Sequence, residues 1–250
     1  MDVHTALDVL RREAGLLAVS AGPALTRHVG RYPDWTVADL VVHTGRIHRW
    51  VTEIVRTAAT EPPPRPDVAP GRTQAALTDW FMSGAADLAL ELQDRDPATK
   101  VWAFADDQSV GFWRTRMALE TTIHRWDVQS ATGTRARIAA DVAADGVTEA
   151  LHVYLRRRLQ GQPLGGAGQR IVLRASDTGQ EWSLAIHAEA ITFGDDETST
   201  APDATITGTA EDLWLYLMGR RDESDLRTDG DAAAVRLCSA VRDLVPAAQR

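Results

Sequence analysis

Residues 119–127 read LETTIHRWD, and apolar residues surround them in the sequence. If this stretch is helical, Glu120 and His124 lie one turn apart on the same face, and Asp127 follows along the same stripe. A carboxylate and an imidazole on an inward-facing stripe must pair with each other or bind something, because an unpaired polar group is costly to bury. Glutamate oxygen and histidine nitrogen are also common ligands of divalent transition metals. The spacing therefore leaves two interpretations open, a Glu–His pair inside a bundle and part of a metal site.

The composition limits the classes of protein to which the chain can belong. Of its 250 residues 44% are hydrophobic and 25% are charged, enough to build a core in one large domain or two modest ones. The net charge of −8 argues against nucleic acid as a partner, because phosphate binding needs a basic face. Cys238 is the one cysteine, so the chain cannot form a disulfide within itself. No apolar run approaches the roughly 20 residues that a membrane helix needs. We expect a soluble, cytoplasmic protein with no nucleic-acid or membrane partner. We expect Cys238 to be a core or near-surface residue without a redox role.

The N-terminal half shows the apolar spacing of four amphipathic helices. We expect these helices at residues 3–29, 37–59, 73–94 and 110–132. Thr36 and Asp39 have the spacing of a capping box at the start of the second helix. The proline-rich stretch 61–71 cannot be helical and predicts a connector. Together these features predict a four-helix bundle, a fold in which metal sites form on facing inward side chains.

Two histidines fall on the second predicted helix. His43 shares the apolar line of Leu40 and Ile47, so we expect it to point into the core. His48 lies off this line, and we expect it near the edge of the helix. A lone buried histidine is usually a hydrogen-bonded core residue, so His43 by itself does not establish a site.

The C-terminal half has a different pattern, beginning after a glycine-rich break at 161–168. A fifth helix is expected before the break, at 139–160. Beyond it we expect strands at 170–174, 182–186, 190–193, 204–207 and 226–228, and helices at 210–219 and 231–245. The predicted fold class is α+β with two domains. A helical bundle with the fifth, connecting helix would cover 1–161, and a smaller antiparallel sheet with helices would cover 162–250.

Two motifs together resemble those of a known family. They read Trp-Thr-x-x-x-Leu-x-x-His from Trp35 to His43 and Glu-x-x-x-His-x-x-Asp from Glu120 to Asp127. The pair resembles the mycothiol-dependent maleylpyruvate isomerase family, whose N-terminal half is a DinB-like metal-binding bundle. One departure is Gly45, which falls one turn into the second helix and predicts a looser helix there.

The second half is similar to that family's C-terminal domain, a sterol-carrier-like α+β module. Residues 213–221, followed by Thr-Asp-Gly-Asp at 228–231, resemble its helix–arginine–strand–Gly-Asp pattern. The resemblance therefore covers nearly the whole chain. It implies Arg220 as a catalytic cation for a carboxylate or a developing enolate. Consecutive arginines at a helix end also suit the helix dipole, which is an open alternative for Arg220 and the favoured one for Arg221.

The resemblance implies that His43, Glu120 and His124 hold a divalent metal, with zinc expected. Two histidines and one carboxylate are the ligands of an open catalytic site. The implied cofactor is mycothiol, a low-molecular-weight thiol, and a metal-bound thiol is deprotonated. Its thiolate would add to a small electrophilic substrate in a maleylpyruvate-isomerase-like cis–trans isomerisation. Two alternatives are a mycothiol S-transferase that conjugates an electrophile, and a non-catalytic metal- or thiol-binding DinB-like protein.

Further residues flank this predicted site. Asp127 is either an outer partner of a metal ligand or a salt-bridge partner of a neighbouring arginine. Arg116 lies one turn before Glu120 and is a weaker candidate for the catalytic cation. The sequence does not name the residues that would bind mycothiol.

Overall fold

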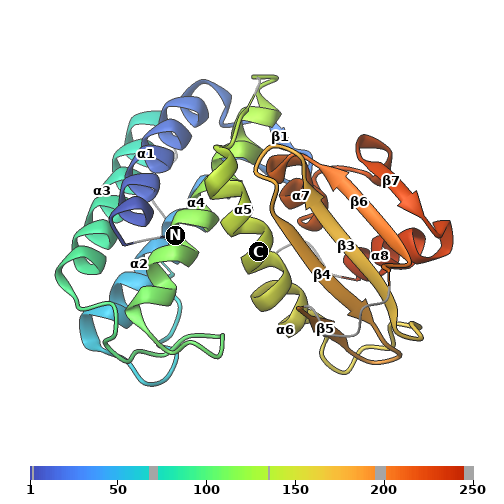
Figure 1. The fold of residues 1–250 in the computed structure, drawn as a ribbon. Coiled ribbons are helices and arrows are strands. Elements are labelled where there is room, and N and C mark those ends of the chain that lie inside the picture. Colours follow the sequence, from blue (N-terminus) through green and yellow to red (C-terminus); the bar gives the residue numbers. More distant parts are fainter. Residues whose placement is uncertain (2, 68–72, 135, 195–200, 245–250) are drawn as a thin grey trace. The chain divides into compact units, whose positions relative to one another are not determined.

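The computed structural model describes residues 1, 3–67, 73–134, 136–194 and 201–244. Its elements confirm the α+β class, with a helical bundle in the N-terminal part and a sheet with helices in the C-terminal part (Figure 1). The described chain divides into two compact units between Arg137 and Ile138. The expected domain limits, 1–161 and 162–250, stay a prediction.

The first unit is a four-helix bundle. Its helices are α1 (Val3–Ala21), α2 (Val37–Thr57), α3 (Gln74–Asp94) and α4 (Val110–Ala131). Helices α1 and α2 each pack mainly on α3 and α4, so that they lie on one diagonal of the bundle. Large apolar side chains fill its centre. Those buried almost completely include Leu10, Leu17, Leu40, Ile54, Phe81, Leu88, Trp113 and Met117.

The first helix is shorter than the sequence pattern suggested. It ends at Ala21 and not at 29, because Pro23 lacks an amide donor and its ring clashes with the preceding turn. The chain continues through a 3₁₀ turn, η1 (Gly22–Ala24), into a small antiparallel hairpin. The hairpin consists of β1 (His28–Val29) and β2 (Tyr32–Thr36).

The predicted start of α2 is confirmed. The Thr36 side chain accepts from the Asp39 amide, and the Asp39 carboxylate accepts from the Thr36 amide at 2.9 Å, which makes a capping box. The connector after α2 has neither helix nor strand over 61–67, and its remaining expected part, 68–71, lies outside the described residues. Trp50 Nε1 donates to the carbonyl oxygen of Pro63 at 2.7 Å and fastens the connector to α2.

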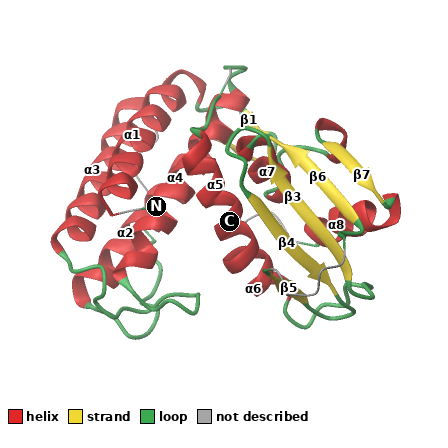
Figure 2. Cartoon of the chain, in the orientation of Figure 1, coloured by secondary structure: helices red, strands yellow, loops and turns green. Residues whose placement is uncertain are grey.

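The second unit contains a five-stranded mixed sheet with the order β5-β4-β3-β6-β7 (Figure 2). Its strands are β3 (Gln169–Ala175), β4 (Glu181–Ile186), β5 (Ile191–Phe193), β6 (Ala204–Gly208) and β7 (Arg227–Gly230). Strand β6 runs parallel to β3, whereas the other pairs are antiparallel. The expected antiparallel sheet is therefore a mixed sheet, because β3 and β6 pair in parallel. Strand β6 lies beside β3 on the side opposite to β4.

Helices accompany this sheet within the second unit. Both α7 (Ala210–Leu217) and α8 (Ala232–Asp243) pack on β3 and β6, and a 3₁₀ turn, η3 (Glu223–Asp225), precedes β7. Val245, the last residue of the expected final helix, lies outside the described residues.

The expected fifth helix is present in three pieces. They are α5 (Ala140–Glu149), which packs on α7, the π-helical segment η2 (Ala150–Leu155) and α6 (Arg156–Leu159). A π-turn adds a residue to the helix, and apolar periodicity does not reveal it.

No helix in the described part of the chain combines the length and apolar character needed to cross a membrane.

Candidate metal centre

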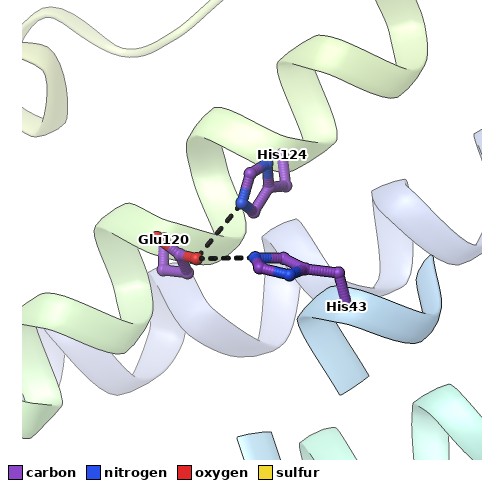
Figure 3. A group of neighbouring side chains, drawn as sticks. All are labelled: His43, Glu120 and His124. Carbon is purple, nitrogen blue, oxygen red and sulfur yellow. Dashed lines mark hydrogen bonds and ion pairs between the residues drawn. The ribbon is translucent and has the colours of Figure 1, made fainter. Parts of the chain in front are cut away.

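Two helices of the bundle bring three potential metal ligands together. His43 comes from α2, and Glu120 and His124 come from consecutive turns of α4 (Figure 3). Glu120 Oε1 lies 3.1 Å from His124 Nε2 and 3.8 Å from His43 Nε2. One ligand atom from each residue lies within 4.8 Å of the other two. The structure thus places the three sequence-predicted residues around one point.

The small hairpin supplies an aromatic wall to this group. Trp35 lies with its ring centroid 4.9 Å from that of His43, and Tyr32 stacks on Trp35 at 4.9 Å. The Tyr32 ring is 6.1 Å from that of His124, and both aromatic residues are buried. Tyr32 was not predicted from the sequence, because a strand this short has no clear alternation and Pro33 reads as a break in helical structure.

Two charged side chains on α4, Asp127 and Arg116, contact the sides of His124 and Glu120 that face away from the ligand group. Asp127 Oδ2 lies 3.1 Å from His124 Nδ1, so Asp127 is an outer partner of a potential ligand. Arg116 Nη2 donates to Glu120 Oε2, the oxygen that does not face the histidines. Arg116 is therefore engaged with the carboxylate of Glu120. All four of these side chains are buried.

The protonation states follow from this arrangement. Burial raises the pKa of Glu120, but Arg116 and His124 outweigh it and hold that pKa well below its ordinary value. Burial lowers the pKa of His124, but Glu120 and Asp127 reverse the effect and raise it. Burial also lowers the pKa of His43, against an opposing hydrogen bond to Glu120. Glu120 is thus ionised and His43 neutral, the forms in which each binds a metal.

The residues present fit a divalent transition metal. Two imidazole nitrogens and one carboxylate oxygen form the ligand set of an open site. Asp127 can accept the Nδ1 proton of His124, which leaves Nε2 directed toward Glu120, as ligating histidines commonly require. The side chain of His43 is 15% exposed, compared with 3% for His124, so one side of the group is more open to solvent.

His48 corrects one expectation. The sequence pattern placed it near the helix edge, but it is 0% exposed. Because α2 packs on both α3 and α4, two of its sides are covered, and His48 faces Thr121 on α4. Its Nε2 lies 2.9 Å from Thr121 Oγ1, and its Nδ1 has no hydrogen-bond partner among the described residues. Burial lowers the pKa of His48 to about 3, so this histidine is a neutral core residue.

Gly45 has a packing role that the sequence did not reveal. A Cβ at Gly45 would lie 2.3 Å from Trp80 Cζ3 on α3, so any larger residue would force Trp80 to shift. Arg49, one turn later, stacks over the Trp80 ring at 3.9 Å and donates to the carbonyl oxygens of Gly45 and Trp80. We expected Gly45 to loosen α2, but in the structure it allows α2 and α3 to approach closely.

Three residues singled out in the second half lie in the second unit. Arg220 donates to the carbonyl oxygen of Met218 at 2.7 Å, and its proposed catalytic role stays a prediction. Arg221 is paired with Asp212, with Nε and Oδ1 2.7 Å apart. Cys238 is a buried free thiol, and burial raises its pKa to about 11. A thiol with that pKa is a poor nucleophile, as expected for a core cysteine.

Comparison with known proteins identifies both halves of the chain. Residues 6–129 match the mycothiol maleylpyruvate isomerase N-terminal domain, and residues 141–237 match the MDMPI C-terminal domain. No curated protein matches the sequence.

Two crystal structures resemble this chain in fold. They are those of the mycothiol-dependent maleylpyruvate isomerase and of a variant in which one histidine is replaced by alanine. Each is 14% identical, has a TM-score of 0.63 and aligns over 92% of this chain and 93% of that chain. At this identity the likeness concerns the fold alone. The two domain matches together span most of the sequence, and the chain therefore belongs to the mycothiol maleylpyruvate isomerase family.

Proposed function

We propose that this chain is a thiol-dependent metalloenzyme. His43, Glu120 and His124 would hold a divalent metal, the metal would bind a thiolate, and the thiolate would add to a small electrophilic substrate. The main support is the convergence of three ligand atoms within 4.8 Å, two from α4 and one from α2. Family membership supports the class of reaction, because the isomerase of known structure is named as mycothiol-dependent.

Each residue of the centre has a separate task in this proposal. His43 Nε2, Glu120 Oε1 and His124 Nε2 would hold the ion, with zinc expected from the ligand types. When bound, the metal lowers the pKa of a coordinated thiol so that it is present as thiolate. Asp127 keeps the imidazole of His124 in the tautomer that presents Nε2. The buried rings of Tyr32 and Trp35 limit the access of water on their side of the centre.

The reaction that we propose is cis–trans isomerisation of a conjugated double bond. In such a reaction a thiolate would add to one alkene carbon while the π electron pair moved onto the conjugated carbonyl oxygen. The former double bond would then be single and free to rotate. Elimination would return the electron pair, break the carbon–sulfur bond and release the same thiolate, so that no atom is gained or lost. A cation would stabilise the enolate, and we propose Arg220 for this role on the strength of the family resemblance.

Incubation of the zinc-loaded protein with mycothiol and maleylpyruvate tests the proposal. We expect the trans isomer to form without consumption of thiol, and the Glu120→Ala variant to lose this activity. A stable adduct with stoichiometric loss of thiol would contradict isomerisation and identify an S-transferase. A metal-loaded protein that changes neither maleylpyruvate nor other electrophiles would overturn the enzymatic proposal and leave a binding protein.

A further inference from the structure

The two oxygens of the Glu120 carboxylate face different partners. Oε1 is the oxygen near both His43 and His124, at 3.8 and 3.1 Å. Oε2 accepts a hydrogen bond from Nη2 of Arg116, which lies one helical turn earlier on α4. The side chains of Arg116 and Glu120 are only 6% and 8% exposed, so water does not compete strongly for this pair. Both groups are charged, since Arg116 keeps Glu120 ionised against the effect of burial.

We propose that Arg116 is a positioning residue that makes Glu120 a one-oxygen ligand and so keeps a metal position open for an anionic thiolate. This inference rests on the proposed function and specifies how its site selects the external ligand. A carboxylate can bind a divalent ion through one oxygen or through both. The hydrogen bond from Arg116 holds Oε2 on the side away from the two histidines, so the carboxylate would occupy one position of the ion and leave another free.

The positive charge of Arg116 also favours an anionic thiolate at the open metal position. A positive charge in contact with a metal ligand favours an anion over a neutral molecule at the open position, because the site is buried and weakly screened. Replacing Arg116 by a neutral side chain removes one positive charge from beside the proposed metal site and leaves the other nearby charges unchanged. The preference for thiolate over a neutral ligand should then fall.

Cobalt-loaded protein allows coordination and ligand choice to be measured without turnover. The wild-type protein and Arg116→Met are loaded with Co²⁺, and the visible absorption spectrum reports the coordination number. Each is then titrated with 2-mercaptoethanol, an anionic ligand when bound, and with imidazole, a neutral one. We expect Arg116→Met to bind Co²⁺ with a weaker visible band, typical of higher coordination. Its preference for the thiol over imidazole should fall by about tenfold, the scale of other changes to the partners of metal ligands.

Arg114 offers a matched control on the same helix. It is also buried, but its guanidinium donates to the carbonyl oxygens of Leu92 and Arg95 and to no ligand carboxylate. Arg114→Met should leave both the spectrum and the ligand preference unchanged. If Arg116→Met does not fold, Arg116→Gln retains an N–H donor without the charge, and its preference for the thiol should still fall.

The outcomes separate this inference from the proposed function. An unchanged spectrum and preference in Arg116→Met, or an unchanged preference in Arg116→Gln, would overturn the role of Arg116 while the proposed function stands. Wild-type protein that binds Co²⁺ but no thiol would refute the proposed function, and the inference would fall with it.

Discussion

His124 and Asp127 form a buried pair on α4, with Nδ1 and Oδ2 3.1 Å apart and side chains only 3% and 1% exposed. The opposite nitrogen of the same imidazole, Nε2, lies 3.1 Å from Glu120 Oε1. The ring is therefore held between two carboxylates, one that belongs to the ligand group and one behind it. Such an outer carboxylate fixes the tautomer and orientation of a ligating histidine and raises its basicity.

Asp127→Asn should weaken metal binding without removing it. The amide oxygen can still accept from His124 Nδ1, but the negative charge that makes the imidazole a stronger ligand is lost. We expect the affinity for Zn²⁺ to fall by about 10- to 100-fold, measured by competition with a chromophoric chelator. Asp87→Asn, on the exposed face of α3, is a suitable control. Equal affinities for Asp127→Asn and wild type would rule out this role.

Removal of one proposed ligand should empty the site and leave the bundle folded. We expect His43→Ala and His124→Ala to lose most of their bound metal by elemental analysis, with far-ultraviolet circular dichroism close to that of the wild type. His48→Gln is the control and should retain the metal. His48 is a buried histidine on α2, like His43, but its hydrogen bond goes to Thr121 and to no member of the ligand group. Full occupancy in His124→Ala would exclude this residue as a ligand.

His48 should make the protein less stable in acid. The pKa of His48 is about 3 in the folded protein, whereas its ordinary value is 6.5. Between pH 6.5 and pH 3 the unfolded chain therefore binds a proton at His48 that the folded chain does not bind. The free energy of unfolding should therefore fall as the pH is lowered from 6.5 to 3. The contribution of His48 to this slope approaches about 1.4 kcal/mol per pH unit. His48→Gln removes it, and urea unfolding between pH 7 and 4 should show a shallower dependence. Parallel slopes for both proteins would refute the prediction.

Substitution of alanine for Gly45 and for Gly15 should change the stability of the protein in opposite directions. Gly45→Ala would place a Cβ 2.3 Å from Trp80 Cζ3, and overpacking of this kind costs about 1–3 kcal/mol, more than the helix propensity gained. At Gly15 on α1 an added Cβ meets nothing within 4 Å, so Gly15→Ala should stabilise the protein by about 0.5–1 kcal/mol. Denaturant midpoints measure both changes. A Gly45→Ala protein as stable as wild type would show that Trp80 moves away easily.

Cys238 should be unreactive while the protein is folded. Its thiol is buried in the second unit beside Tyr216, and burial raises its pKa to about 11, so little thiolate is present at neutral pH. We expect a disulfide reagent to label it slowly in native protein and within minutes in urea. Rapid labelling of the folded chain would mean that the chain carries an accessible thiol of its own.

Local features of the centre could be predicted from sequence because they depend on neighbouring residues. The spacing of Glu120 and His124 places them on one helical face, and the spacing of Thr36 and Asp39 specifies a cap. The short strand β2, which begins at Tyr32 and contains Pro33, left no comparable signal, so Tyr32 was missed. The depth of His48 was misjudged, because apolar periodicity shows the centre of a buried face and not its width.

The sequence by itself determined the helical bundle, the α+β class and the turn-by-turn order of the α4 side chains, since hydrophobic period and capping act over a few residues. It did not determine the direction of β6 or the division of the Glu120 oxygens between His43 and Arg116. Only the tertiary structure decided these, because they depend on how segments far apart in the chain pack against one another, and local propensity carries no information about that packing.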